Sequence, residues 1–250
     1  MVEIKHRETG ATLETIAADS LVGADLRDMQ LSGADLRGMD LSGANLTSSD
    51  LDGACLAGAR LVDAILIGVH LKQADLSEAD LTRARLGSEH PARSAMLNHA
   101  NLAGARLAQA DLRGVEIRYA NLQGADLSHA DLRGTDFHGS DLRSVKATSA
   151  LFIRANLREA DLSDADLRDC HLNDANLVRA NLSQADLTST TPEGFTVINL
   201  ANLEGANLNG ARLRGVLAQD TNFRHANLTN VDLTNASLGG SILHRADVTN

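Results

Sequence analysis

The residues of this chain that could do chemistry are carboxylates, histidines and cysteines. The 250 residues include 33 Asp and Glu, nine His and two Cys. Two carboxylates can act as general acid and general base where burial in a cleft separates their pKa values. Histidine and cysteine can hold a metal where their spacing brings three or four ligands together. Which of this chemistry is available depends on the elements that position these side chains.

A large apolar residue, mostly Leu, recurs at every fifth position and dominates the sequence. The runs cover residues 21–86, 97–187 and 198–248. We call each such residue a repeat centre and number its neighbours relative to it. Position −2 is mostly Ala, position −1 is usually Asp or Asn, and position +2 is often Gly, as in residues 34–38. The pattern makes nearly the whole chain one continuous array.

A period of five fits neither an α-helix nor a flat strand. On a helix, successive centres would be displaced by roughly 140° and would face every direction. On a flat strand, alternate centres would face opposite sides. All centres can point inward only if the chain turns by a fixed amount every five residues and closes into a coil. Such coils stack about 4.8 Å apart by backbone pairing, with positions −1, +1 and +2 facing solvent.

The Ala-(Asp/Asn)-Leu-x-x pattern resembles that of the pentapeptide repeat family. The resemblance implies an all-β fold, a right-handed quadrilateral parallel β-helix with four repeats in each coil. The sequence holds 44 repeat centres, which would make about 11 coils in such a solenoid. The family includes Qnr-type members, rods that resemble B-DNA in width and charge and engage DNA gyrase. The resemblance therefore implies a binding protein.

The sequence divides into a short N-terminal segment and the array. Alternating apolar residues on either side of Gly10 predict a β-hairpin in residues 1–18, which would cover the first coil as a cap. Residues 19–250 are predicted to form the β-helix, interrupted at 87–96 and 188–197, where neighbouring centres lie eleven positions apart instead of five. Each interruption is either a one-residue bulge in the coil or a six-residue loop, and its turn-rich composition favours the loop.

The exposed carboxylates recur on every side of a convex rod, so we expect no catalytic residues and no enzyme. The histidines have no metal-ligand spacing beside cysteine, and no glycine-rich loop precedes a helix, so neither a metal nor a cofactor is expected. Arginines mostly share a repeat with Asp, which argues against direct nucleic-acid binding. Cys55 faces outward and Cys170 inward, more than five coils apart and too far for a disulfide.

The sequence also predicts where the protein acts. No apolar run approaches the roughly 18 residues of a membrane span, so no membrane association is expected. The first residues, Met1 to Lys5, lack the apolar core of a signal peptide. We therefore expect a cytoplasmic protein.

Four repeats in each coil, with both interruptions treated as loops, assign every outward residue to one of four sides. One side collects the aliphatic residues Ile65, Ile67, Leu151, Ile153, Val197 and Leu217. Aliphatic side chains that face solvent on a polar rod indicate that this side, together with the neighbouring interruption at 188–197, contacts a protein or a second copy. The alternative is that these side chains pack beneath the protein's own loops.

Another side collects acidic residues: Asp35, Asp75, Glu78, Asp141, Asp161, Asp164 and Asp247, against Arg37 and Arg143. A DNA mimic needs a continuous acidic surface, because duplex DNA carries one charge per roughly 1.7 Å of its axis. This side carries far less negative charge per length of the rod, although the chain has a formal net charge of −10.

We therefore predict a non-enzymatic protein-binding or scaffold rod whose protein partner the sequence does not identify. A DNA-mimicking modulator of DNA gyrase, of the quinolone-resistance type, is the alternative. Members of the family that inhibit gyrase dimerise at the C-terminal coil, so the resemblance also implies a homodimer through that coil. Because the repeat pattern continues to Val248, we expect no extension after the last repeat, which would be a departure from those members.

Overall fold

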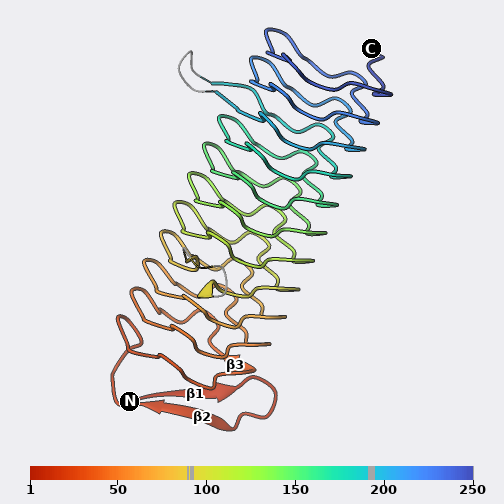
Figure 1. Cartoon of the computed structure of the whole chain (residues 1–250). Helices are drawn as coiled ribbons and strands as arrows, with labels where there is room; N and C mark the ends of the chain where they lie inside the picture. The colour runs from red at the N-terminus through yellow and green to blue at the C-terminus, as the bar shows by residue number, and fades with distance from the viewer. Residues whose placement is uncertain (89, 91–92, 191–194, 250) are drawn as a thin grey trace.

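The computed structural model describes residues 1–88, 90, 93–190 and 195–249. Figure 1 shows a rod of stacked coils with a hairpin at its N-terminal end. Strands β1 (Val2–His6) and β2 (Thr12–Ile16) pair antiparallel, and β1 also pairs antiparallel with β3 (Ala34–Asp35). Ile4 of β1 is fully buried in the same core as the repeat centres, so the hairpin and the rod share one core. The boundary of the hairpin at residue 18 and the role of the hairpin as a cap stay predictions.

Successive coils pair through their backbones at position −1. Asp25 bridges in parallel to Asn45, and Asp131 bridges to Leu151 in the same way. Around the first of these bridges, Leu26 N donates to Asn45 O at 2.8 Å and Asn45 N donates to Ala24 O at 2.9 Å. Repetition of this pairing makes four ladders along the rod, one on each side. The coil with parallel backbone pairing that the period of five predicts, and the four sides that the family resemblance implies, are therefore confirmed.

The coil continues in register across both interruptions. The ladders pair residues 20 apart within a run, but His70 pairs with Met96 and His171 with Val197. Each interruption thus lengthens the spacing by six residues, as a loop requires, whereas a bulge would lengthen it by one. Residues 89, 91–92 and 191–194, which include Pro91 and Pro192, lie outside the described residues.

Most of the described repeats end in a β-turn that explains their outward composition. Ala34 N donates to the carbonyl of the preceding centre, Leu31, at 3.0 Å. The +2 residue in such a turn has positive φ, 67° at Gly33 and 58° at Asp63, which matches the third residue of a type II turn and favours Gly, Asn and Asp. No α-helix occurs in the described ranges, and hence none that could cross a membrane.

Candidate protein-binding surface

One of the four ladders carries aliphatic residues at its outward position −1. It runs from Asp25 to Ser237 and includes Ile65, Leu151, Val197 and Leu217. Ile67 and Ile153 occupy position +1 of the same repeats as Ile65 and Leu151. All six side chains are half-buried. The structure thus brings the six predicted residues to one side, which we call the aliphatic side, and their role in binding stays a prediction.

The aliphatic side divides into two parts. Between Ile65 and Leu151, its ladder passes through Arg85, Asp111 and Asp131. Both aspartates form ion pairs with the arginines two residues further along the chain, at 2.8 and 2.6 Å. The isoleucines at 65 and 67 are therefore separated by charged coils from the other four aliphatic residues. The aliphatic side therefore has an N-terminal and a C-terminal group of aliphatic residues along the rod.

Two exposed apolar side chains that sequence analysis did not name extend the C-terminal part of this side. Phe195 is 43% exposed and Leu200 is 59% exposed. Leu200 occupies position +2 with φ of 61°, a left-handed conformation that a bulky apolar residue rarely adopts. A leucine at a position that is usually Gly or polar was the available signal. We call the following six residues the apolar strip: Leu151, Ile153, Phe195, Val197, Leu200 and Leu217.

Thr196, the residue next to Phe195, is held by hydrogen bonds to Asp169 and Ser189. The fully buried Thr196 accepts a hydrogen bond from Asp169 N at its Oγ1, at 2.8 Å. The Asp169 carboxylate accepts a hydrogen bond from Thr190 N at 2.9 Å, and Thr196 N donates to Ser189 Oγ at 3.2 Å. Both described ends of the second interruption are thus tied to the rod, which keeps Phe195 beside the ladder position of Val197.

The predicted acidic residues also share one side, which we call the acidic side. Asp35, Asp75, Asp141, Asp161 and Asp247 occupy position −1 of its ladder, and Glu78 and Asp164 occupy position +2 of its repeats. Between these carboxylates the ladder holds Cys55, Asn101, Asn121, Asn181, Asn207 and Asn227. The negative charge is therefore interrupted by neutral coils.

The asparagines of the acidic side are hydrogen-bonded to their ladder neighbours. Asn181 Nδ2 donates to Asp161 at 2.9 Å, and Asn207 Nδ2 donates to Asn181 Oδ1 at 3.0 Å. Asp141 pairs instead with Arg143, and the hydrogen bond from that guanidinium holds the pKa of Asp141 below its usual value. These asparagines and Asp141 thus find their partners within the rod.

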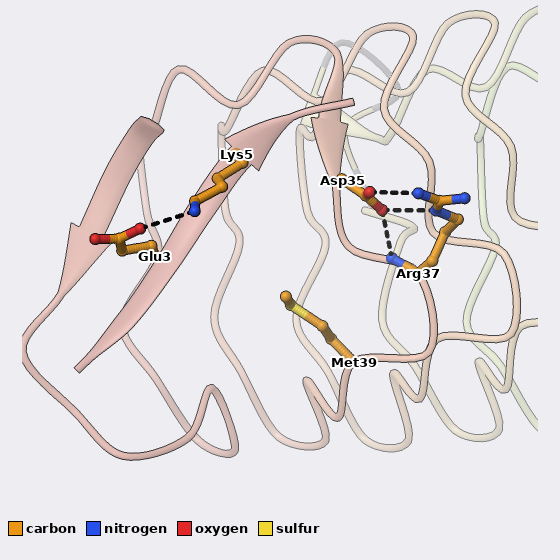
Figure 2. Close-up of a pocket in the computed structure, with 5 residues that line it drawn as sticks. All are labelled: Glu3, Lys5, Asp35, Arg37 and Met39. Carbon is orange, nitrogen blue, oxygen red and sulfur yellow. Dashed lines mark hydrogen bonds and ion pairs between the residues drawn. The ribbon is translucent and has the colours of Figure 1, made fainter. Parts of the chain in front are cut away.

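A hollow of about 470 Å³ lies between β1 and the acidic side (Figure 2) and is lined by Glu3, Lys5, Asp35, Arg37 and Met39. Lys5 Nζ lies 3.2 Å from Glu3, and Arg37 donates from Nε to Asp35 at 2.8 Å. This guanidinium lowers the pKa of Asp35. A carboxyl group with a lowered pKa holds no proton near neutral pH, so it is poorly suited to donate one as a general acid.

Three side chains that sequence analysis did not group together could approach a cation. Asp50, Asp52 and His70 each offer a ligand atom, and these atoms lie within 4.8 Å of one another. However, Asp50 Oδ1 accepts a hydrogen bond from Asp52 N at 2.9 Å, and Asp52 Oδ1 accepts one from Lys72 N at 2.8 Å. Because these oxygens already stabilise the backbone, we assign no metal to this cluster.

Comparisons with known proteins identify the repeat. The family model described as pentapeptide repeats matches eight times, at residues 20–58, 54–87, 95–134, 110–146, 120–158, 150–188, 199–235 and 219–250. No curated protein matches the chain.

Solved structures that are similar to this chain carry the same repeat. One is HetL, a pentapeptide repeat protein involved in heterocyst differentiation regulation from the cyanobacterium Nostoc sp. strain PCC 7120. It is 33% identical, with 92% of this chain and 90% of HetL covered and a TM-score of 0.37. Another is QnrB1, a plasmid-mediated fluoroquinolone resistance protein, which is 17% identical, with 89% and 90% covered and a TM-score of 0.39.

Proposed function

Because the chain belongs to the pentapeptide repeat family, whose fold is a right-handed quadrilateral β-helix, we propose that it is a non-enzymatic rod that binds a protein partner. The observation that carries this proposal is the apolar strip. Its residues hold outward positions that are polar on most other coils, and two of them, Phe195 and Leu200, are widely exposed. A partner that covered the strip would remove this apolar surface from water.

The composition of the strip supports a protein as the partner. Leu151, Val197 and Leu217 lie on one ladder, with His171 between the first two. Neighbouring ladder positions are about 4.8 Å apart, so the side chains form a narrow row along the rod axis. Burial of a large apolar side chain contributes roughly 1.5–3 kcal/mol, and a few central side chains usually dominate a protein interface. Phe195 is the expected anchor because it is the largest side chain in the row.

A second copy of this chain is the other occupant of the strip to be tested. The last coil offers a separate surface for self-association, because its centres Leu243 and Val248 are 40% and 59% exposed. A homodimer through this coil would cover those two centres and leave the strip free. A homodimer through the strip would instead depend on Phe195 and Leu217.

Substitution of the strip tests the proposal. The double variant Ile153→Ser/Leu217→Ser is expected to weaken partner capture or self-association by about tenfold or more. Truncation of a side chain in the middle of an interface reduces the binding free energy by over about 1 kcal/mol. Affinity capture from the native cell and sedimentation velocity measure the two forms of binding. The matched control is Ile65→Ser/Ile67→Ser, which makes the same chemical change on the separate part of the aliphatic side. Unchanged capture and sedimentation in the first variant, or equal loss in the control, would contradict the proposal.

A gyrase-binding DNA mimic is the competing function. Its support is that five aspartates share the ladder of the acidic side. The asparagines between them leave a charge density well below one charge per roughly 1.7 Å of axis in duplex DNA. We therefore expect purified protein at micromolar concentration to leave gyrase supercoiling unchanged. Inhibition that disappears in Asp75→Asn/Asp161→Asn would favour the mimic instead.

A further inference from the structure

The fourth side of the rod, whose ladder runs from Asp40 to Asp232, carries a row of charges of alternating sign. We call it the alternating side. In ladder order, the row consists of Asp40, Arg60, Asp80, Arg106, Asp126 and Lys146. Negative and positive groups thus follow one another at intervals of about 4.8 Å along the rod. The alternation reaches Asp166 and ends there, because Asp186 follows on the next coil.

The basic groups of this row have few partners inside the rod. Among the residues that the structure describes, Arg106 and Lys146 form no ion pair, and both are exposed. Arg60 approaches Asp40 only to 3.8 Å, between Nη1 and Oδ2. An exposed ion pair of this kind contributes little to stability. The three cations are therefore available to acceptors outside the rod.

The carboxylates of the row also have free acceptor capacity. Each uses Oδ1 to accept the backbone N–H two residues further along the chain, at 3.0 Å for Asp40, 3.1 Å for Asp80 and 3.0 Å for Asp126. Within the described part of the chain, Oδ2 of Asp80 and Oδ2 of Asp126 accept no hydrogen bond. The turns thus hold these side chains in place and leave one oxygen of each for a partner.

The surface beside the row is low and electrically neutral. Position +1 on these coils holds no side chain larger than Val: Ser42, Val62, Thr82, Ala108, Ser128 and Thr148. Position +2 adds one charge of each sign, since Asp63 pairs with Arg83 at 2.7 Å. Four basic and four acidic residues therefore compensate one another over the six coils. Another surface can approach this side without net repulsion from it.

We propose that the alternating side binds a second copy of this chain, with the two rods antiparallel about a two-fold axis that passes between Asp80 and Arg106. A two-fold axis in the plane of contact reverses the order of the row, so each charge faces one of opposite sign. The facing pairs, each made twice, are Asp40 with Lys146, Arg60 with Asp126 and Asp80 with Arg106. The inference goes beyond the proposed function, because it involves neither the apolar strip nor the last coil.

Charge complementarity selects this arrangement over its alternatives. Parallel rods would place every charge of the row opposite its own copy, and like charges that meet in an interface are costly. Antiparallel rods shifted by one coil would also bring like charges together. A shift by two coils restores the alternation, but it places Asp63 opposite Asp169 at position +2. In the proposed register Asp63 faces His129 instead.

The formal net charge of −10 on each copy acts from further away than the facing pairs do. At an ionic strength of about 0.15 M the screening length is about 8 Å, so charges on the other sides of the two rods repel one another weakly. The facing groups are in contact and neutral as a set. Because exposed ion pairs contribute little each, we expect a weak dimer with a dissociation constant of about 0.1–1 mM.

Two charge reversals and their mixture test the inference. In Arg106→Glu, and separately in Asp80→Lys, two facing pairs become pairs of like charge, and dimerisation is expected to weaken about tenfold or more. In an equimolar mixture, Glu at 106 of one variant faces Lys at 80 of the other, so the mixture is expected to dimerise like the natural chain. Sedimentation equilibrium at about 0.5 mM protein and about 0.15 M salt measures the average mass.

Arg85→Glu is the matched control, because Arg85 holds position −1 on the aliphatic side and the substitution changes the net charge equally. It is expected to dimerise like the natural chain. Asp80→Lys loses the hydrogen bonds from Thr82, so circular dichroism checks that each variant is folded. Arg60→Glu and Asp126→Lys repeat the design at the next facing pair.

Four results would overturn the inference. They are a natural chain that stays monomeric at about 1 mM, dimerisation that survives both charge reversals, equal weakening by Arg85→Glu, and a mixture that stays as monomeric as its two components. The strip variant Ile153→Ser/Leu217→Ser is expected to dimerise through the alternating side like the natural chain. Failure at this surface is therefore distinguishable from failure of the apolar strip.

Discussion

The acidic side and the apolar strip use the same backbone position in opposite ways. On the acidic side, Asn181 and Asn207 hold position −1 and hydrogen-bond to their ladder neighbours. In the strip, Val197 and Leu217 hold the same position on another ladder, but their side chains cannot form hydrogen bonds. The difference teaches that charge is a poor guide to a binding surface on this rod. What matters is whether the interactions of a side chain are completed inside the rod or left for a partner.

The largest effects are expected where the two sides do not differ, at their buried centres. Leu172 lies behind the aliphatic side and Leu182 behind the acidic side, and both are fully buried. Leu172→Ala and Leu182→Ala should each reduce the free energy of unfolding by about 2–5 kcal/mol, because each leaves a cavity in the same stack of leucines. The midpoint of urea unfolding measures both. A clearly unequal pair of shifts would mean that the sides differ in their cores as well.

An exchange of outward residues between the two sides should reduce the free energy of unfolding by less than the core substitutions do. The loss should also differ between the two sides. Asn181→Leu removes the donor to Asp161 and the acceptor for Asn207 Nδ2, and we expect a loss of about 1–2 kcal/mol because a typical hydrogen bond contributes about 1 kcal/mol. Leu217→Asn should change stability by less than about 0.5 kcal/mol, as is usual at surface positions.

The urea unfolding midpoints of these two variants show whether the strip stabilises the rod. If Leu217→Asn costs as much as Asn181→Leu, the strip stabilises the rod itself, which is the alternative that the sequence left open. If it costs little but removes partner binding, the strip exists for contact. The pair of variants thus tests structure and function at matched ladder positions.

The repeat predicts the fold well because the residue types within each five-residue unit determine the conformation of that unit. Each unit shows a Leu centre, an Ala at −2 and a turn residue at +2. Once four units close a coil, residues 20 apart must pair along a ladder. With the register known, the grouping of Leu151 with Leu217 and of Asp75 with Asp161 could be predicted from the sequence alone. The contact roles of these residues stay predictions.

The details that the repeat does not encode were missed for physical reasons. The position of Phe195 depends on hydrogen bonds of Thr196 and Asp169, which join residues on opposite sides of an interruption. The amide chain through Asn181 follows the 20- and 26-residue spacings, which become visible only when the interruptions are known to be loops.

The smallest expected effect concerns the charge of the acidic side. The hydrogen bond from Arg143 lowers the pKa of Asp141 in the folded chain. A lowered pKa stabilises the fold above the unfolded pKa, and this contribution is lost as the pH falls through the folded pKa. Arg143→Gln should therefore cost a few tenths of a kcal/mol near neutral pH, since the pair is partly exposed, and nothing once Asp141 is protonated. Urea midpoints at neutral and strongly acidic pH measure the difference.

Arg154→Gln is the matched control for this pH dependence, because Arg154 lies on the aliphatic side, is 79% exposed and approaches Asp174 only to 3.8 Å. It should change stability little at either pH. If Arg143→Gln costs the same at both pH values, Arg143 stabilises the rod by covering apolar surface with its methylene groups. The charge of Asp141 would then be available to a partner, and the contrast between a self-contained acidic side and an unsatisfied apolar strip would fail at this coil.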